Sequence, residues 1–271
     1  MENFNFNYKN NSVRTRYKKD TASNYDKKRE KRKKWKLEMG AINEIGASLD
    51  NDPTIVDVPT GTGRILLPLT KASHRVYGID ISMDMLLQTK TKYASNPVEI
   101  LRGDAVTLPL KDKSVDYVFC LRLLNWVTEK TTTKMLNEFG RVSRKGLVIG
   151  IRTEKPLNVL DFIRFGILNL IPTPHHVSHW TSTIKTFANR VKGKLTFETR
   201  RLLGKKPQSN SGKKEFNIKM YYNKDKLFGL FSGLGLVIEK EFYIDTLCSF
   251  SKRLARPYSI YVLKFRDGRA R

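Results

Sequence analysis

Cysteine is scarce in this sequence, and long apolar segments are missing. Only two cysteines, Cys120 and Cys248, occur among the 271 residues. Two cysteines exclude a disulfide framework and a cysteine-rich zinc site, and they favour a reducing compartment. No run of 18 apolar residues occurs, and the polar start MENFNFNYKNNS lacks the apolar core of a signal peptide. We therefore expect a cytoplasmic protein that is neither exported by a signal peptide nor membrane-spanning.

Acidic residues are also few. The chain has 26 Asp and Glu against 51 Lys and Arg, which gives a formal net charge of +25 and a pI near 10. Residues 1–38 carry a net charge of +8 (13 basic, 5 acidic), and residues 154–214 carry +9 (12 basic, 3 acidic). Such charge favours nucleic acid, an anionic membrane surface or phosphorylated substrates as partners. A solvated surface without a partner explains the same composition.

The chain divides into zones of different pattern. Residues 1–24 are polar and basic and predict a flexible arm, while 25–271 predict a single domain. Within it, residues 25–50 predict a helix, because Leu37, Ala41, Ile45 and Leu49 recur on one face. No internal repeat is present.

Strands alternate with helices from residue 54 to residue 153. This alternation predicts right-handed crossovers and a parallel, Rossmann-like doubly wound α/β sheet. Pro68 is expected to cost its helix a hydrogen bond. The predicted strands are 54–58, 75–80, 98–104, 114–121, 146–151, 236–244 and 258–265, and the predicted helices are 63–72, 82–93, 131–143 and 223–232.

The segment 154–215 interrupts this rhythm. It opens with the apolar stretch VLDFIRFGILNLIP and later contains the loop-like LLGKKPQSNSGKK. Its histidines, His175, His176 and His179, could include a general base or simply belong to a polar loop. A basic insertion after the fifth strand is therefore predicted.

The stretch VDVPTGTGR, residues 56–64, links the first strand to a helix through two glycines. Leu66 stands where a dinucleotide-binding G-x-G-x-x-G motif needs its third glycine, and no phosphate-binding P-loop motif is present. Ligands of open α/β sheets lie beyond the carboxyl ends of the strands, which is where this loop falls. Acids stand at the ends of the first two strands, Asp57 and Asp80. A ligand with an amino-acid end and a nucleoside end would use both.

These segments together resemble class I S-adenosylmethionine-dependent methyltransferases, in particular the small-molecule branch that includes quinone-biosynthesis enzymes. DVPTGTGR resembles motif I of that family, and YGIDIS resembles motif II. LRGDAVTLPLKDKSVDYVFC, EFGRVSRKGLVIG and YYNKDKLFGLFSGLGLVIEKEF resemble the later motifs in order. SNYDKKR resembles an N-terminal element of the same branch. The resemblance covers about residues 20–265, apart from the insertion, and it implies that the insertion, about residues 154–215, covers the substrate.

The resemblance implies a seven-stranded sheet with an antiparallel last strand and S-adenosylmethionine as cofactor. Asp57 would organise the loop and the cofactor's amino end, and Asp80 would accept from both ribose hydroxyls. Asp104 would accept from the adenine amino group. Ile81 and Met83 would pack on the adenine, although both could equally belong to the core. The full set of implied cofactor-binding residues is Asp57, Thr60, Gly61, Thr62, Gly63, Asp80, Ile81, Met83, Asp104, Ala105 and Leu121.

The catalytic residues stay open. Pro59 replaces the first glycine of motif I, and Asn125 and Trp126 stand where relatives often carry histidines, so no family-type catalytic histidine is implied. Arg122, at the exit of the fourth strand, could bind an anionic substrate or be a surface charge. Cys120 is expected to be a buried apolar residue, not a nucleophile. The remaining weak candidates are His175, His176 and His179, and no metal site is expected.

Three functions fit these patterns. The first is a methyltransferase for a small or lipid-like, anionic acceptor, with possible contact to an anionic membrane surface. The second is an RNA-directed methyltransferase that tracks phosphates with its basic segments, although no NPPY-type motif follows the fourth strand. The third is a non-catalytic basic protein built on the same fold, against which the intact glycine loop and Asp80 argue. No obligate protein partner is evident.

Overall fold

The computed structural model describes residues 33–50, 52–73, 75–94, 98–154, 221–244 and 257–266, which all belong to one compact unit. The predicted basic arm and most of the predicted insertion, with its three histidines, lie outside these residues. Among the described residues, no helix is both long and apolar enough to cross a bilayer.

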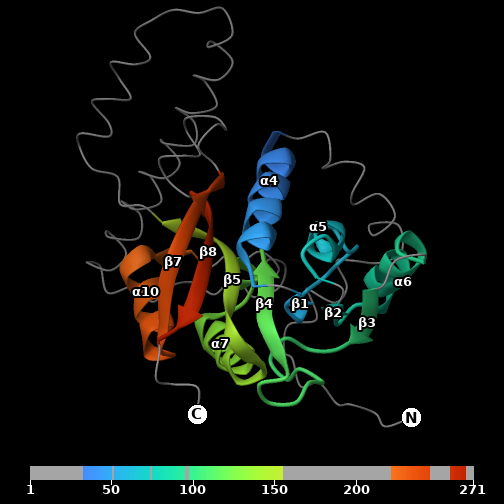
Figure 1. The fold of residues 1–271 in the computed structure, drawn as a ribbon. Coiled ribbons are helices and arrows are strands. Elements are labelled where there is room, and N and C mark those ends of the chain that lie inside the picture. The colour runs from blue at the N-terminus through green and yellow to red at the C-terminus, as the bar shows by residue number, and fades with distance from the viewer. Residues whose placement is uncertain are drawn as a thin grey trace, which may run out of the picture. The chain divides into compact units, whose positions relative to one another are not determined.

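The described strands form one twisted sheet in the order β3-β2-β1-β4-β5-β8-β7 (Figure 1). A short strand, β6, pairs with the end of β5 beside this path. The strands are β1 (Ile55–Asp57), β2 (Val76–Asp80), β3 (Val98–Arg102), β4 (Val115–Leu121), β5 (Ser143–Glu154), β6 (Tyr222–Asn223), β7 (Leu236–Tyr243) and β8 (Tyr258–Phe265).

Strand direction follows the prediction. β1 to β5 pair in parallel, whereas β8 is antiparallel to both of its neighbours, β5 and β7. The predicted seven-stranded sheet with an antiparallel last strand is confirmed. The two-residue β6 was not predicted, because so short a segment carries no periodicity.

Polar capping residues define where several helices begin. Ser82 caps α6 (Met83–Lys92) by accepting a hydrogen bond from the backbone of Met85, and Asn223 caps α10 (Lys224–Gly233) in the same way. Both helices begin where the sequence predicts. α7 (Glu129–Val142) begins two residues earlier than predicted, because Thr128 supplies its cap. The first described helix is α4 (Lys33–Ser48), which lies within the predicted range 25–50.

The helix after the glycine loop is shorter than predicted. α5 spans only Leu66–Thr70, because the glycines before it adopt positive φ angles that a right-handed helix cannot contain. Pro68 is then the third residue of the helix. The first N–H groups of a helix have no partner within it, so Pro68 costs no helical hydrogen bond, contrary to the prediction.

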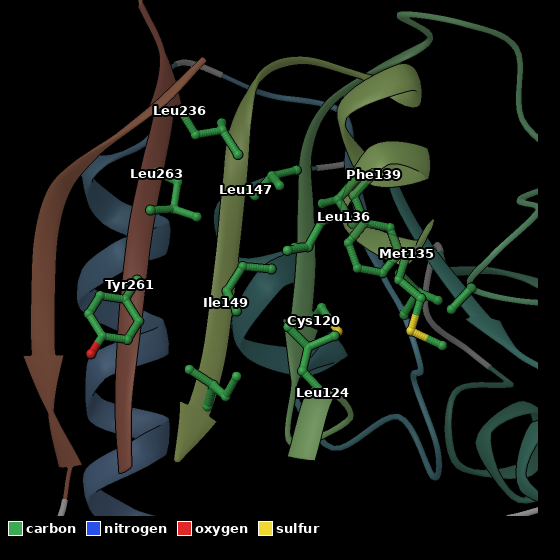
Figure 2. Packing of buried hydrophobic residues seen from close by; sticks show 14 of the residues in the cluster. Cys120, Leu124, Met135, Leu136, Phe139, Leu147, Ile149, Leu236, Tyr261 and Leu263 are labelled. Atoms are coloured by element: carbon green, nitrogen blue, oxygen red, sulfur yellow. The ribbon is translucent and has the colours of Figure 1, made fainter. Parts of the chain in front are cut away.

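Two hydrophobic clusters lie on opposite faces of the sheet. α4 and α5 cover one face through Ile42, Ile45 and Leu66, which are fully buried. On the other face, α7 and α10 pack on alternate residues of the same strands. Figure 2 shows Leu136 and Phe139 of α7 beside β4 and β5, near Cys120, Leu147 and Ile149. Because both faces are buried, the carboxyl edge of the parallel strands is the part of the sheet left for a ligand.

Candidate active site

The glycine loop lies at the carboxyl end of β1, as the sequence predicts. Gly61 and Gly63 adopt φ angles of +59° and +71°, which favour glycine. Their surroundings differ. A Cβ atom on Gly63 would stand 2.7 Å from both Thr89 and Tyr93, whereas a Cβ on Gly61 would meet nothing within 4 Å. Gly63 is therefore needed for packing against α6, while Gly61 leaves open space beside its backbone.

Asp80 connects this loop to the end of β2. Its Oδ2 accepts a hydrogen bond from the backbone N–H of Gly61 at 2.8 Å, and its Oδ1 accepts from the N–H of Ser82 at 2.8 Å. The residue is 6% exposed. Burial raises the pKa of Asp80, and the N–H groups of Ser82 and Gly61 oppose that rise. Asp80 thus contacts the glycine loop directly, while its predicted bonds to ribose hydroxyls stay a prediction.

Side chains of α6 and its C-cap residue hold the glycine loop by hydrogen bonds. The Thr89 hydroxyl donates to the carbonyl of Gly61 at 2.8 Å, and the Tyr93 hydroxyl donates to the carbonyl of Gly63 at 2.7 Å. The same Tyr93 oxygen accepts from the backbone N–H of Leu67 at 3.2 Å. The loop carbonyls are thus held by side chains 28 and 30 residues further along the chain.

Asp57 is enclosed at the end of β1. It is 2% exposed. Burial raises the pKa of its carboxyl group to about 7, against the opposing effects of Thr60 and Arg64. A buried carboxylate is costly without a cationic partner, so this position is suited to an ammonium group arriving with a ligand.

The other predicted cofactor residues differ in their surroundings. Met83 is 51% exposed, so the alternative that it belongs to the core is wrong, and Ile81 is partly exposed. Asp104 is buried, and its Oδ1 accepts from the N–H of Val106 at 3.1 Å. Ala105 and Leu121 are both buried within the two hydrophobic clusters. Thr60 and Thr62 are each 4% exposed. The contacts of these residues with a cofactor stay predictions.

Arg122 is not a simple surface charge. It follows β4 with a φ angle of +64°, which is unusual for a residue other than glycine. Its Nε donates to Glu38 Oε1 at 3.0 Å, and its Nη2 forms a short hydrogen bond to Glu38 Oε2. Arg64 Nη1 donates to the same Oε2 at 2.6 Å, and the Tyr258 hydroxyl donates to Oε1 at 2.8 Å. We call Glu38, Arg64, Arg122 and Tyr258 the Glu38 cluster.

Glu38 is ionised at neutral pH despite its full burial. Burial acts to raise its pKa, but Arg64 and Arg122 outweigh that effect and leave the pKa below its usual value. Glu38 lies on α4, and its partners come from the glycine loop, the end of β4 and the start of β8. The Glu38 cluster therefore ties the first described helix to the carboxyl edge of the sheet.

Asn125 has a structural role. Its side-chain amide donates to the carbonyl of Arg152 at 2.9 Å and accepts from the N–H of Arg152 at 2.8 Å, which fastens the exit of β4 to β5. Cys120 is fully buried, and burial raises the pKa of its thiol far above neutrality. Such a thiol stays protonated, as expected for an apolar core residue.

Sequence patterns did not reveal Glu38, Thr89, Tyr93 or Tyr258. A signal for Glu38 did exist: it lies three and four residues before Ala41 and Ile42, on the buried face of α4. A carboxylate that is buried among apolar residues needs a cationic partner. The position of Glu38 in the sequence therefore predicts a buried Arg or Lys beside it. No group of three potential metal ligands lies among the described residues.

Comparisons with known proteins agree with this geometry. Residues 55–146 match a family model described as a methyltransferase domain. A malonyl-[acyl-carrier protein] O-methyltransferase from Xylella fastidiosa is 37% identical over 81 residues, which cover 29% of this chain and 28% of the relative. A demethylmenaquinone methyltransferase from Staphylococcus aureus is 38% identical over 106 residues, which cover 37% of this chain and 43% of the relative. The chain thus spans less than half the length of either relative.

Solved structures extend the likeness in fold. Magnesium protoporphyrin IX methyltransferase from Synechocystis PCC 6803, solved with bound SAH, matches with a TM-score of 0.53 and 15% identity, covering 85% of this chain and 84% of that chain. The complex of the Haloferax volcanii Trm112 methyltransferase activator with the putative methyltransferase matches with a TM-score of 0.57 and 16% identity, covering 93% and 97%. The fold is that of class I S-adenosylmethionine-dependent methyltransferases, as the sequence motifs predict.

Proposed function

We propose that this protein transfers a methyl group from S-adenosylmethionine to a small-molecule acceptor that carries an anionic group. The observation that carries the proposal is the bond between Asp80 and the N–H of Gly61. It places a buried carboxylate at the mouth of a glycine loop that has open space beside Gly61. The names of the relatives, which refer to malonyl-[acyl-carrier protein], demethylmenaquinone and magnesium protoporphyrin IX, support a small-molecule acceptor.

The residues present fit such a cofactor. Asp80 can accept hydrogen bonds from ribose hydroxyls, because a carboxylate oxygen that accepts from a backbone N–H keeps a second lone pair. Asp57 offers a buried negative charge for the ammonium of the amino-acid end. The cofactor, when bound, supplies a methyl group already activated by its sulfonium. The protein has then to orient the acceptor and exclude water.

The chain's own groups limit the mechanism. The buried thiol of Cys120 is protonated, which argues against a covalent cysteine intermediate. Asn125 uses its amide to join β4 to β5 and supplies no general base. Positioning of the acceptor at the exit of β4 is therefore the contribution that the described residues can make.

A titration of the full-length protein with S-adenosylhomocysteine tests the cofactor, and transfer of a labelled methyl group to small acidic metabolites tests the reaction. The proposal predicts micromolar or tighter binding for the wild type. The absence of measurable binding to folded protein would refute it. In the RNA-directed alternative, label would instead enter RNA, and in the non-catalytic alternative no label would transfer although the chain is folded.

A further inference from the structure

The segment between β3 and β4 carries Asp104, the acid predicted to accept from the amino group of adenine. This segment folds back on itself. The carbonyl of Asp104 accepts from the N–H of Thr107 at 3.0 Å, and its Oδ1 accepts from the N–H of Val106 at 3.1 Å. A Cβ atom on Gly103 would stand 2.8 Å from Pro109, so these two residues lie against each other. The turn is closed within itself, and its place in the molecule depends on what holds its two ends.

The first end of the turn is held by β2. The N–H of Gly103 donates to the carbonyl of Asp80 at 3.1 Å. Asp80 is the predicted ribose anchor, so this bond joins the backbone beside the two acids. A nucleoside presents its ribose and its base at a fixed separation, and the groups that bind them have to be held close to that geometry by their supporting contacts.

The second end of the turn is held by side chains of α7. Glu138 Oε1 accepts from the N–H of Leu108 at 2.6 Å. Arg141, three residues further along, donates from Nη2 to the carbonyl of Leu108 at 3.3 Å and from Nη1 to the carbonyl of Leu110 at 2.9 Å. Both backbone polar groups of Leu108 are thus bound by α7.

Glu138 and Arg141 also fix each other. Arg141 donates from Nε to Glu138 Oε2 at 2.9 Å and from Nη2 to Oε1 at 2.7 Å, a bidentate arrangement that restricts both side chains. The hydrogen bond from Arg141 lowers the pKa of Glu138, against the opposing effect of burial, so the carboxylate is charged at neutral pH. Because this pair is bonded to backbone groups as well, it determines where Leu108 and the turn before it lie.

We infer that Glu138 and Arg141 are positioning residues that set the place of Asp104 and thereby make the site selective for the amino group of adenine. The inference rests on the proposed function and deepens it, because it names what determines recognition of the nucleobase. Both residues act through the backbone of Leu108. A well-placed carboxylate accepts from the 6-amino group of adenine and disfavours the 6-oxo group of hypoxanthine, since an ionised carboxylate has no proton to donate.

Discrimination between two nucleobases tests the inference. Calorimetry on the full-length protein compares S-adenosylhomocysteine with S-inosylhomocysteine, whose base carries an oxygen in place of the amino group. The wild type should prefer S-adenosylhomocysteine by roughly tenfold or more, the scale of a hydrogen bond to a charged group. E138Q and R141Q should lose most of this preference. R141K keeps the positive charge if R141Q folds poorly, and it should lose the preference too, because a compact ammonium cannot reproduce the fork of guanidinium donors.

E129Q and R144Q are the matched controls. Glu129 lies on the same helix and pairs with Lys226, and Arg144 pairs with Asp116. In the described part of the chain, neither is bonded to residues 104–110. Both control variants should keep the wild-type preference.

A double-mutant cycle with D104A separates positioning from a general loss of stability. If Glu138 acts through Asp104, E138Q weakens S-adenosylhomocysteine in the wild-type background and not in the D104A background. An equal effect in both backgrounds overturns the inference, and so does a nucleobase preference that E138Q and R141Q leave at the wild-type value. A wild type that binds both ligands equally also overturns the inference alone, whereas a folded wild type that binds neither overturns the proposed function and the inference with it.

Discussion

The Oδ2 atom of Asp80 accepts a hydrogen bond from the backbone N–H of Gly61 at 2.8 Å, across 19 residues of sequence. The bond joins the ends of β1 and β2, neighbours in the parallel sheet. One carboxylate oxygen is thus anchored by Gly61 and the other by Ser82. The lone pairs that remain define where a ligand's hydroxyl groups would be bound.

Asp80→Ala should weaken binding of S-adenosylhomocysteine by roughly 1.5–3 kcal/mol, the scale of a hydrogen bond to a charged group. Isothermal titration calorimetry measures the change. Asp84→Ala is the control, because Asp84 is a carboxylate in the first turn of α6 on the same segment. Equal affinities for the two folded variants would rule out Asp80 as the ribose anchor.

Replacement of the two loop glycines should separate binding from stability. In Gly61→Ala, the left-handed backbone costs about 1–2 kcal/mol and the new methyl group enters the open space beside the loop. Gly63→Ala adds a clash with Thr89 and Tyr93, worth a further 1–3 kcal/mol by the usual cost of overpacking. We expect Gly61→Ala to lose more cofactor affinity and Gly63→Ala to lose more free energy of unfolding. The reverse order in urea denaturation would contradict this division of roles.

Asp57 should make stability depend on pH. Its folded pKa, about 7, lies above the ordinary value of 3.8. The folded state therefore loses stability as pH rises from about 4 to about 7, by up to about 4 kcal/mol for a shift of this size. Asp57→Asn should remove that loss, so the variant's stability relative to wild type should increase over this range. A difference that is flat with pH in denaturant titrations would show that Asp57 is charged throughout.

Glu38→Gln should destabilise the fold by roughly 3 kcal/mol or more, because Arg64 and Arg122 would lose their shared carboxylate. Glu44→Gln is the matched control on the same helix. Glu44 pairs with Lys240, but its side chain is 59% exposed, and such pairs contribute about 0–1 kcal/mol. Chemical denaturation at pH 7 gives both values, and similar costs for the two variants would contradict the assigned role of Glu38.

The pH dependence at Glu38 has the opposite sign to that at Asp57. Its pKa is lowered in the folded state, so its contribution is present above the ordinary value of 4.5 and is lost as pH falls through the folded pKa. Below that pH the carboxyl is protonated and the advantage of wild type over Glu38→Gln should shrink. An advantage that is constant down to low pH would indicate that the carboxylate does not titrate with folding.

The sequence predicted the elements whose signals are local. Apolar runs bounded by polar residues predicted β4 and β8, and Ser82 and Asn223 predicted the starts of α6 and α10. The starts of α5 and α7 were less well predicted. Positive φ angles at Gly61 and Gly63, and a cap at Thr128, decide these boundaries, and neither follows from periodicity.

In the candidate site, too, features that depend on neighbouring residues were predicted, and contacts between residues far apart in the sequence were not. The pattern of strands predicted that the glycine loop and Asp80 lie at the ends of the first two strands, on one edge of a parallel sheet, but not the hydrogen bond that joins them. The Glu38 cluster could not be predicted as a unit, because Tyr258 is 220 residues from Glu38 and reaches it only through the position of β8 next to β5. Glu38 alone was detectable, as a charge on an apolar stripe.

The hydrogen bonds from Thr89 and Tyr93 to the loop carbonyls have a consequence for the thermodynamics of association. They fix the backbone of residues 61–63 during folding, so the conformational entropy of this loop is lost before any ligand arrives. A preorganised loop then adds little ordering cost to binding, and more of the contact energy appears as affinity. Thr89 and Tyr93 reach the loop carbonyls from α6 and its C-cap, so they fix the loop backbone while the space beside Gly61 stays open.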